Sequence, residues 1–173
     1  VPYENTPENS VEILRNLGQN IDIVAGLFDQ NFLENRQCAA LELSREPIRG
    51  AVSIYHPLAA KDHLTVEDLH GENFLLIRRG WNRYLDQMRD ELWRDHPQIR
   101  IVDFEMFNIN VFNQCENSED ILMTIDNWRQ VHPLLKTIPV DWSYTIPYGL
   151  LHSPRPTPTV RRFLKAVQTV YQL

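Results

Sequence analysis

Helical and strand-like apolar patterns alternate from the start of the chain. Apolar residues recur at helical spacing over Val11–Leu17, after the helix-start sequence Thr6-Pro7-Glu8, and Gly18 ends the pattern. The next run, Gln19–Phe28, predicts a strand that is buried on both faces of a parallel sheet. With the strand-like segment Val1–Glu4, this helix and strand predict a βαβ unit with parallel strands.

Two further apolar runs follow a polar stretch. The stretch Asp29–Arg36 predicts a loop. The runs Cys38–Leu43 and Ile48–Tyr55 are separated by the turn-like sequence Ser44-Arg45-Glu46-Pro47. We therefore expect these two runs to pair as an antiparallel edge on a parallel sheet.

The middle of the chain repeats the alternation of strand and helix, and the Pro-rich last third ends in an amphipathic helix. We predict a short helix over Thr65–Gly71, followed by strands and helices over Phe74–Ile77, Trp81 or Asn82 to Asp95, Ile99–Phe104, Asn108–Cys115 and Asp120–Ile125. Strands over Leu134–Val140 and Tyr144–Leu151 come next, and a helix follows Pro158. The repeated β-α-β-α-β order indicates two α/β lobes.

Composition narrows the function classes. The chain has 173 residues and a formal net charge of −6, which argues against a nucleic-acid surface because phosphate contacts need clustered cations. No apolar run approaches the roughly 20 residues of a membrane span, and no signal peptide opens the chain. Cys38 and Cys115 stand far apart within apolar patterns, which is typical of buried free thiols and favours the cytoplasm.

Motifs for catalysis or metal binding are scarce. The sequence has no Walker loop, GxSxG, HExxH or GxGxxG, so we predict neither catalytic residues nor a cofactor. His56, His63 and His70 are evenly spaced, but Pro57 and Gly71 prevent one helix from aligning them, and we interpret them as surface or turn residues with no metal.

Polar and aromatic groups at predicted strand ends are the remaining candidates. Arg78 and Arg79 precede a helix start, where arginines and helix amides together favour an anion, although solvated arginines fit the pattern equally well. A cleft lined by aromatic side chains would suit a small molecule with an apolar part, and the candidates are Phe28, Trp81, Phe107 and Trp128. Each of them, taken alone, also fits a position in the core.

The order of several segments resembles one known family. These segments are Glu12-Ile13-Leu14-Arg15, Ile21-Asp22-Ile23-Val24-Ala25-Gly26, Tyr55-His56-Pro57-Leu58-Ala59, Leu64–Phe74 and Pro154–Val167. They are similar to segments of the effector-binding domain of LysR-type transcriptional regulators. In that family the corresponding segments are a helix followed by "D-L-A-I-G", the sequence "HPLA", the stretch "V-x-x-D-L-x-G-E-P-F" and the closing helix.

The resemblance implies an α/β fold with two lobes like those of type 2 periplasmic binding proteins, with three-layer α/β/α lobes and mixed, mostly parallel sheets. Lobe I would comprise residues 1–55 and 149–173, and lobe II residues 56–148. Compared with the family, the chain begins at the second strand and contains no helix-turn-helix. We therefore expect an incomplete first lobe and DNA binding only through a helix-turn-helix that is not in this chain.

For function, the resemblance implies a non-enzymatic cytoplasmic regulator domain that binds a small effector in the cleft between its lobes and forms a homodimer or higher oligomer. An alternative is the solute-binding protein of a transport system, which shares the architecture; the free cysteines and the absent signal peptide favour the regulator. The expected effector is an organic anion or amphipathic metabolite, and the resemblance places effector-facing positions at Thr6, Leu27, Phe28, Arg78, Arg79, Trp81, Met106, Phe107 and Asn127.

Overall fold

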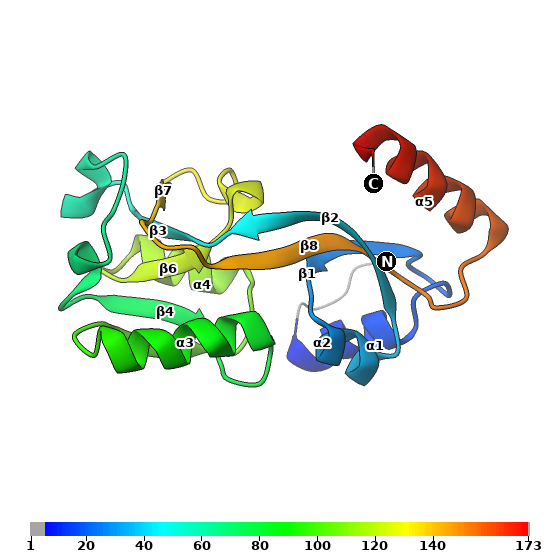
Figure 1. The fold of residues 1–173 in the computed structure, drawn as a ribbon, viewed down its shortest axis with the longest axis horizontal. Coiled ribbons are helices and arrows are strands. Elements are labelled where there is room, and N and C mark those ends of the chain that lie inside the picture. Colours follow the sequence, from blue (N-terminus) through cyan, green and yellow to red (C-terminus); the bar gives the residue numbers. More distant parts are fainter. Residues whose placement is uncertain (1–5, 173) are drawn as a thin grey trace. The chain divides into compact units, whose positions relative to one another are not determined.

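The computed structural model describes residues 6–172 and divides into two compact units (Figure 1). Unit 1 comprises Val1–Arg45 and Ile146–Leu173, and unit 2 comprises Glu46–Thr145. Residues 46–55, which we expected in the first lobe, belong to unit 2, and residues 146–148, expected in the second lobe, belong to unit 1. The predicted strand Val1–Glu4, and with it the parallel βαβ unit, lies outside the described residues.

Unit 2 is built on a five-stranded sheet with the order β5-β4-β6-β3-β7. The central strand β4 pairs in parallel with both β5 and β6, whereas β3 pairs antiparallel with β6 and β7. We expected mostly parallel sheets, and this sheet is mixed in equal parts. Its strands are β3 (Arg49–Ser53), β4 (Asn73–Ile77), β5 (Arg100–Phe104), β6 (Ile121–Thr124) and β7 (Leu135–Pro139).

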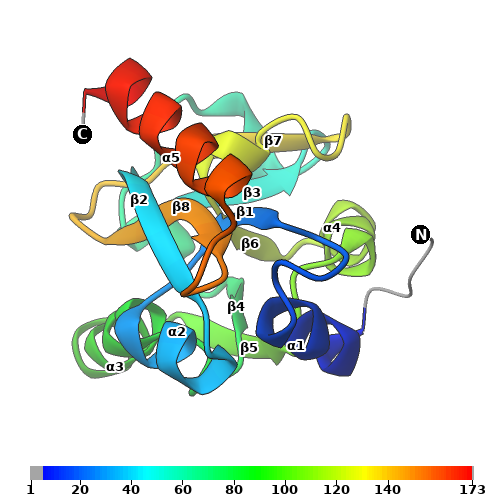
Figure 2. The same cartoon turned by 90° about the vertical axis from the view of Figure 1, so that its right-hand side faces the viewer.

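Two helices connect the parallel strands of unit 2. Helix α3 (Arg83–Asp95) leads from β4 to β5, and helix α4 (Ile109–Glu116) leads from β5 to β6. The first connection moves to one side of β4 and the second returns past it to the other side. Because parallel crossovers are right-handed, helices that travel in opposite directions cover opposite faces of the sheet, as Figure 2 shows.

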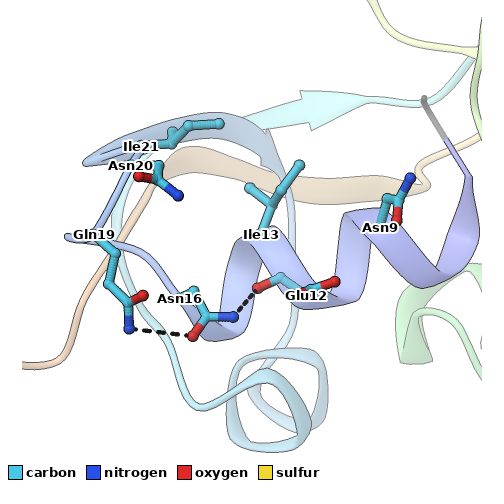
Figure 3. Close-up of a pocket in the computed structure, with 7 residues that line it drawn as sticks. All are labelled: Asn9, Glu12, Ile13, Asn16, Gln19, Asn20 and Ile21. Atoms are coloured by element: carbon cyan, nitrogen blue, oxygen red, sulfur yellow. Dashed lines mark hydrogen bonds between the residues drawn. The ribbon is translucent and has the colours of Figure 1, made fainter. Parts of the chain in front are cut away.

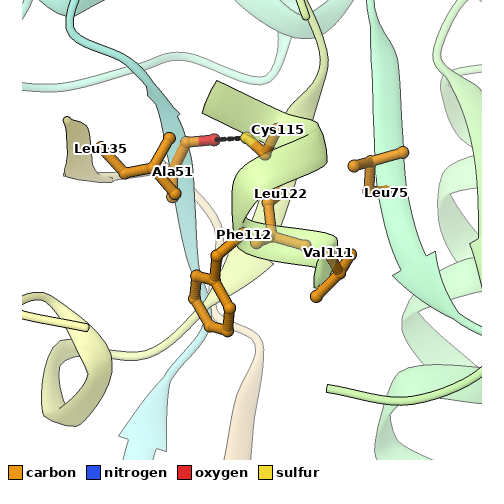
Figure 4. Close-up of a cluster of buried hydrophobic side chains, with 7 residues drawn as sticks. All are labelled: Ala51, Leu75, Val111, Phe112, Cys115, Leu122 and Leu135. Atoms are coloured by element: carbon orange, nitrogen blue, oxygen red, sulfur yellow. Dashed lines mark hydrogen bonds between the residues drawn. The ribbon is translucent and has the colours of Figure 1, made fainter. Parts of the chain in front are cut away.

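The core of unit 2 fills both faces of this sheet. Under α4, a buried apolar cluster joins the helix to the four strands β3, β4, β6 and β7 (Figure 4); its members are Ala51, Leu75, Val111, Phe112, Cys115, Leu122 and Leu135. The other helix, α3, buries Leu85, Met88 and Leu92, as its apolar spacing predicted. The strand and helix predictions for residues 74–125 are therefore confirmed, with the predicted short helix at 65–71 reduced to a 3-10 turn over Glu67–Leu69.

Unit 1 carries a three-stranded sheet with the order β1-β8-β2. Strand β1 (Ile23–Leu27) is an edge strand that pairs antiparallel with β8 (Thr145–His152), and most of its residues are only partly buried. The prediction of a strand buried on both faces of a parallel sheet was wrong. The apolar run Ile21–Phe28 is short, and its last residues, not its middle, enter the core.

The predicted antiparallel pair of residues 38–55 does not form. Strand β2 (Ala39–Pro47) runs straight through the expected turn and lies beside β8, while β3 joins the sheet of unit 2. An extended stretch with ordinary turn residues can continue as strand when a partner is available, and here that partner comes from the far end of the sequence.

Three helices complete unit 1: α1 (Pro7–Arg15), α2 (Gln30–Arg36) and α5 (Pro158–Tyr171). Helix α2 occupies the stretch that we predicted as a loop. Its start is marked by Asp29, whose carboxylate accepts from the backbone N–H of Phe32 at 2.6 Å. Among the helices of residues 6–172, none combines the length and apolar character needed to cross a bilayer.

Candidate functional site

In unit 2, the parallel strands β4 and β5 end at the same edge of the sheet. These strands are neighbours, and their following helices depart to opposite faces of the sheet. Ligands of open α/β sheets bind outside the carboxyl ends of the strands, where the strand order reverses. Here that point lies between β4 and β6, because the chain leads from β4 toward β5 and from β6 toward β7. The segments at this edge of the sheet are residues 78–82, after β4, residues 105–108, after β5, and residues 125–129, after β6.

A group of aromatic side chains, which we call the aromatic cluster, lies at this edge. It consists of Trp81, Phe104, Phe107 and Trp128, all partly buried. Phe107 is central: its ring centroid is 4.8 Å from those of Phe104 and Trp128 and 5.8 Å from that of Trp81. The edge-to-face and tilted geometries are those that aromatic quadrupoles favour. The structure thus brings together three of the four aromatic residues of the predicted cleft, Trp81, Phe107 and Trp128, whereas the fourth, Phe28, belongs to unit 1.

The two predicted arginines are exposed and each is engaged by an acid. Arg78 Nε lies 2.8 Å from a carboxylate oxygen of Glu105, so this ion pair joins the segments after β4 and β5. Arg79 pairs with Asp90 of α3, and this hydrogen bond lowers the pKa of the Asp90 carboxyl. The backbone amide of Gly80 is also engaged, because both carboxylate oxygens of Asp86 in α3 accept from its N–H at 3.0 and 3.2 Å.

Of the other predicted site residues in unit 2, Met106 is partly buried beside Phe107 in the chain, and Asn127 is exposed in a 3-10 turn that follows β6. That turn is anchored because Asp126 accepts from Arg49 at 3.0 and 3.2 Å.

The remaining predicted residues belong to unit 1. Thr6 caps α1, with its hydroxyl accepting from Asn9 N–H at 3.2 Å. Leu27 is the last residue of β1 and Phe28 follows it; they are 3% and 8% exposed. Phe28 N–H donates to the Pro147 carbonyl at 3.2 Å, which fixes the end of the strand beside β8.

His56 holds a turn through both of its ring nitrogens. Within residues 6–172, no group of three or more potential ligands is arranged to bind a metal ion. His56 is buried: its Nδ1 lies 3.0 Å from Leu58 N–H, and its Nε2 lies 3.1 Å from the Glu119 carbonyl. Nδ1 accepts from Leu58 N–H, and this arrangement leaves Nε2 to donate to the Glu119 carbonyl, so both ring nitrogens have structural partners.

Three surface cavities are distinct from the predicted effector positions. The one in Figure 3, of about 390 Å³, lies along α1 and the chain that leads to β1, and amide side chains such as Asn16 and Gln19 line it. Two others, of about 440 and 350 Å³, lie beside α5 and beside the buried His56. None of the effector-facing residues predicted from the sequence lines any of these three.

One residue of the loop after β4, Asn82, was not among the candidates from the sequence. It is 1% exposed and caps α3, because its Oδ1 accepts from Tyr84 N–H at 2.9 Å. Its Nδ2 is one of two buried side-chain atoms without a hydrogen-bond partner among the described residues; the other is Nε of Arg89. The N-cap pattern, asparagine directly before a helical stripe, was the signal available in the sequence.

The comparisons with known proteins agree with this architecture. The family model described as the LysR substrate binding domain matches residues 3–172, and the chain belongs to this family. The comparison with curated proteins found no match. The family assignment decides between the two sequence-based readings in favour of the regulator domain, which is non-enzymatic.

Solved structures of the same kind are similar in fold. The effector binding domain of QuiR in complex with shikimate has a TM-score of 0.67 at 14% identity, with 98% of this chain and 80% of that chain covered. The regulatory domain of CcmR from Synechocystis PCC6803 in complex with 2-PG has a TM-score of 0.66 at 13% identity, over 95% of this chain and 79% of that one. The effector binding domain of BenM with its effector benzoate has a TM-score of 0.59 at 18% identity, over 98% and 77%. The chain spans 56% of full-length BenM.

Proposed function

We propose that this chain is the ligand-sensing domain of a cytoplasmic LysR-type transcription regulator, and that its effector is a small organic anion with an apolar part. The observation that carries the proposal is the aromatic cluster at the switch point of the sheet in unit 2. A partly buried group of edge-to-face and tilted rings beside two helix starts suits a flat apolar body with a polar group at one end. Support comes from the relatives, whose effector domains are described with shikimate, benzoate and 2-PG.

The same proposal includes the unit 1 residues Thr6, Leu27 and Phe28 as effector-facing, a homodimer or higher oligomer as the working form, and a shift of conformation or assembly as the response to the effector. We assign DNA binding to no residue among 6–172.

Isothermal titration calorimetry with benzoate and with shikimate tests the proposal. We expect saturable binding to the wild type and an affinity at least about tenfold lower in Phe107→Ala, because the central ring loses its contact area. Phe107→Leu, which preserves most of the buried volume, separates lost contact from lost folding. The control is Trp93→Ala on α3, since Trp93 is 76% exposed and outside the cluster. Equal affinity in all variants would remove the cluster from the site.

A further inference from the structure

We propose that Asn82 determines which effectors bind, because its side-chain Nδ2 donates a hydrogen bond to an oxygen of the effector's acid group. The proposal rests on the proposed function, and it names the chemical class of the polar end: a carboxylate or another oxygen acceptor, beside a ring held by the aromatic cluster. Asn82 is directly next to Trp81 in the chain, and Trp81 is a member of that cluster.

The orientation of the Asn82 amide is fixed by the helix that it caps. Oδ1 accepts from Tyr84 N–H at 2.9 Å, and a flipped amide would place its own N–H groups against that donor. Nδ2 therefore stays on the side away from the capped amide. Capping of the helix therefore uses the Oδ1 atom of Asn82, and the Nδ2 atom has no structural role in the cap.

An unused donor at this depth has a cost. Asn82 is 1% exposed, and its Nδ2 has no partner among the described residues. Aspartate and serine cap helices as well as asparagine does and carry no amide donor, so capping alone does not require this group. A buried donor that lacks a partner gains most from a ligand that supplies an acceptor.

Three other donors of the loop after β4 are already engaged. Arg78 pairs with Glu105, Arg79 pairs with Asp90, and the Gly80 amide binds Asp86. Helix α3 is 13 residues long, so its start adds a partial positive charge that favours an anion beside Asn82. The arginines that the sequence suggested as the anion site are thus held by acids, whereas Nδ2 of Asn82 has no partner among the described residues.

The experiment measures affinities for benzoate and for benzamide, which share the ring and differ in whether the polar end only accepts or also donates. The wild type is expected to prefer benzoate. In Asn82→Asp the cap oxygen remains, but the donor becomes a charged acceptor that repels benzoate and accepts from the benzamide NH2 group. We expect the benzoate-to-benzamide preference to fall at least about tenfold and to reverse. Thermal unfolding of the variant reports whether the cap is retained.

Asn113→Asp is the matched control, because it adds the same charge to an exposed position of α4 and is expected to leave the preference unchanged. If Asn82→Asp folds and keeps the wild-type preference while Phe107→Leu weakens both probes, the assignment of Asn82 is overturned and the proposed function stands. If neither probe binds the wild type, the proposed function falls, and the assignment of Asn82 falls with it.

Discussion

Burial changes the ionisation of Cys115. The thiol is fully buried in the cluster under α4, and Sγ lies 3.4 Å from the carbonyl oxygens of Ala51 and Asp120. Desolvation disfavours the thiolate and raises the pKa of Cys115 to about 12, from 9.0 for an ordinary thiol. An inert, protonated thiol fits the expectation from sequence that neither cysteine acts as a nucleophile.

The raised pKa predicts how stability depends on pH. Below pH 9.0 both the folded and the unfolded thiol are protonated, and the full contribution to stability is present. Between pH 9.0 and about 12 the unfolded chain loses the proton while the folded chain keeps it, so the free energy of unfolding falls as the pH rises. The slope from this one group approaches about 1.4 kcal/mol per pH unit.

Urea unfolding of the wild type and of Cys115→Val at pH 8, 9, 10 and 11 measures this contribution. We expect the wild-type curve to fall more steeply above pH 9, since Tyr144, Cys38 and the lysines titrate in both proteins and their effects cancel. Parallel curves would show that the Cys115 thiol is not desolvated in solution.

Among the elements, strands β1, β8 and β2 meet at a pair of glycines. Gly26 of β1 lies opposite Gly149 of β8 in the antiparallel register. A Cβ on Gly149 would lie 2.2 Å from the carbonyl oxygen of Leu41 in β2, whereas a Cβ on Gly26 would meet only the Leu151 side chain at 3.8 Å. Only a residue without a side chain lets β8 and β2 approach this closely.

We therefore predict that Gly149→Ala destabilises the protein by about 3 kcal/mol or more, because the added methyl group meets backbone that cannot yield without separating the strands. The natural control is Gly26→Ala, the same substitution at the opposing position, which is expected to change stability by less than about 1 kcal/mol. Chemical unfolding monitored by circular dichroism compares the two. Equal effects in both variants would mean that β2 does not lie against β8 at Gly149.

The sequence predicted elements well where their boundaries are local. Strand β4 is a continuous buried run, and α3 and α4 begin at the asparagines 82 and 108, each of which caps its helix through a side-chain oxygen. Prediction failed where the partner is distant: β2 pairs with a strand about 100 residues later, which no local pattern in residues 38–47 encodes. Helix α2 was missed because Phe32 is its only buried residue.

For the site, residue types indicated three members of the aromatic cluster, but not Phe104 and not the state of the polar neighbours. Arg78 and Arg79 read as free cations in the sequence, and their acidic partners Glu105 and Asp90 come from other segments. The unpartnered nitrogen of Asn82 depends on everything that surrounds it, so it becomes visible only when the fold is known.

At the scale of the whole molecule, unit 2 has the features of an independent folding unit. Its sheet contains both parallel and antiparallel pairs that lie wholly within residues 46–145, and its core residues Leu75 and Leu122 are fully buried there. The chain enters and leaves at adjacent points, since Ile48 N–H donates to the Tyr144 carbonyl at 3.0 Å. A unit with neighbouring ends can be removed from its parent chain without opening its core.

We predict that residues 46–145, produced alone, fold and melt cooperatively. Amide shift dispersion in a two-dimensional NMR spectrum and thermal unfolding by circular dichroism check this outcome. Leu122→Ala in the fragment is expected to lower its stability by about 2–5 kcal/mol, as for a leucine removed from a close-packed core, which shows that the melting unit is the one seen in the structure. A fragment with collapsed amide shifts and no melting transition, although the full chain melts sharply, would show that the sheet of unit 2 depends on unit 1. The two units would then fold and unfold as one cooperative unit.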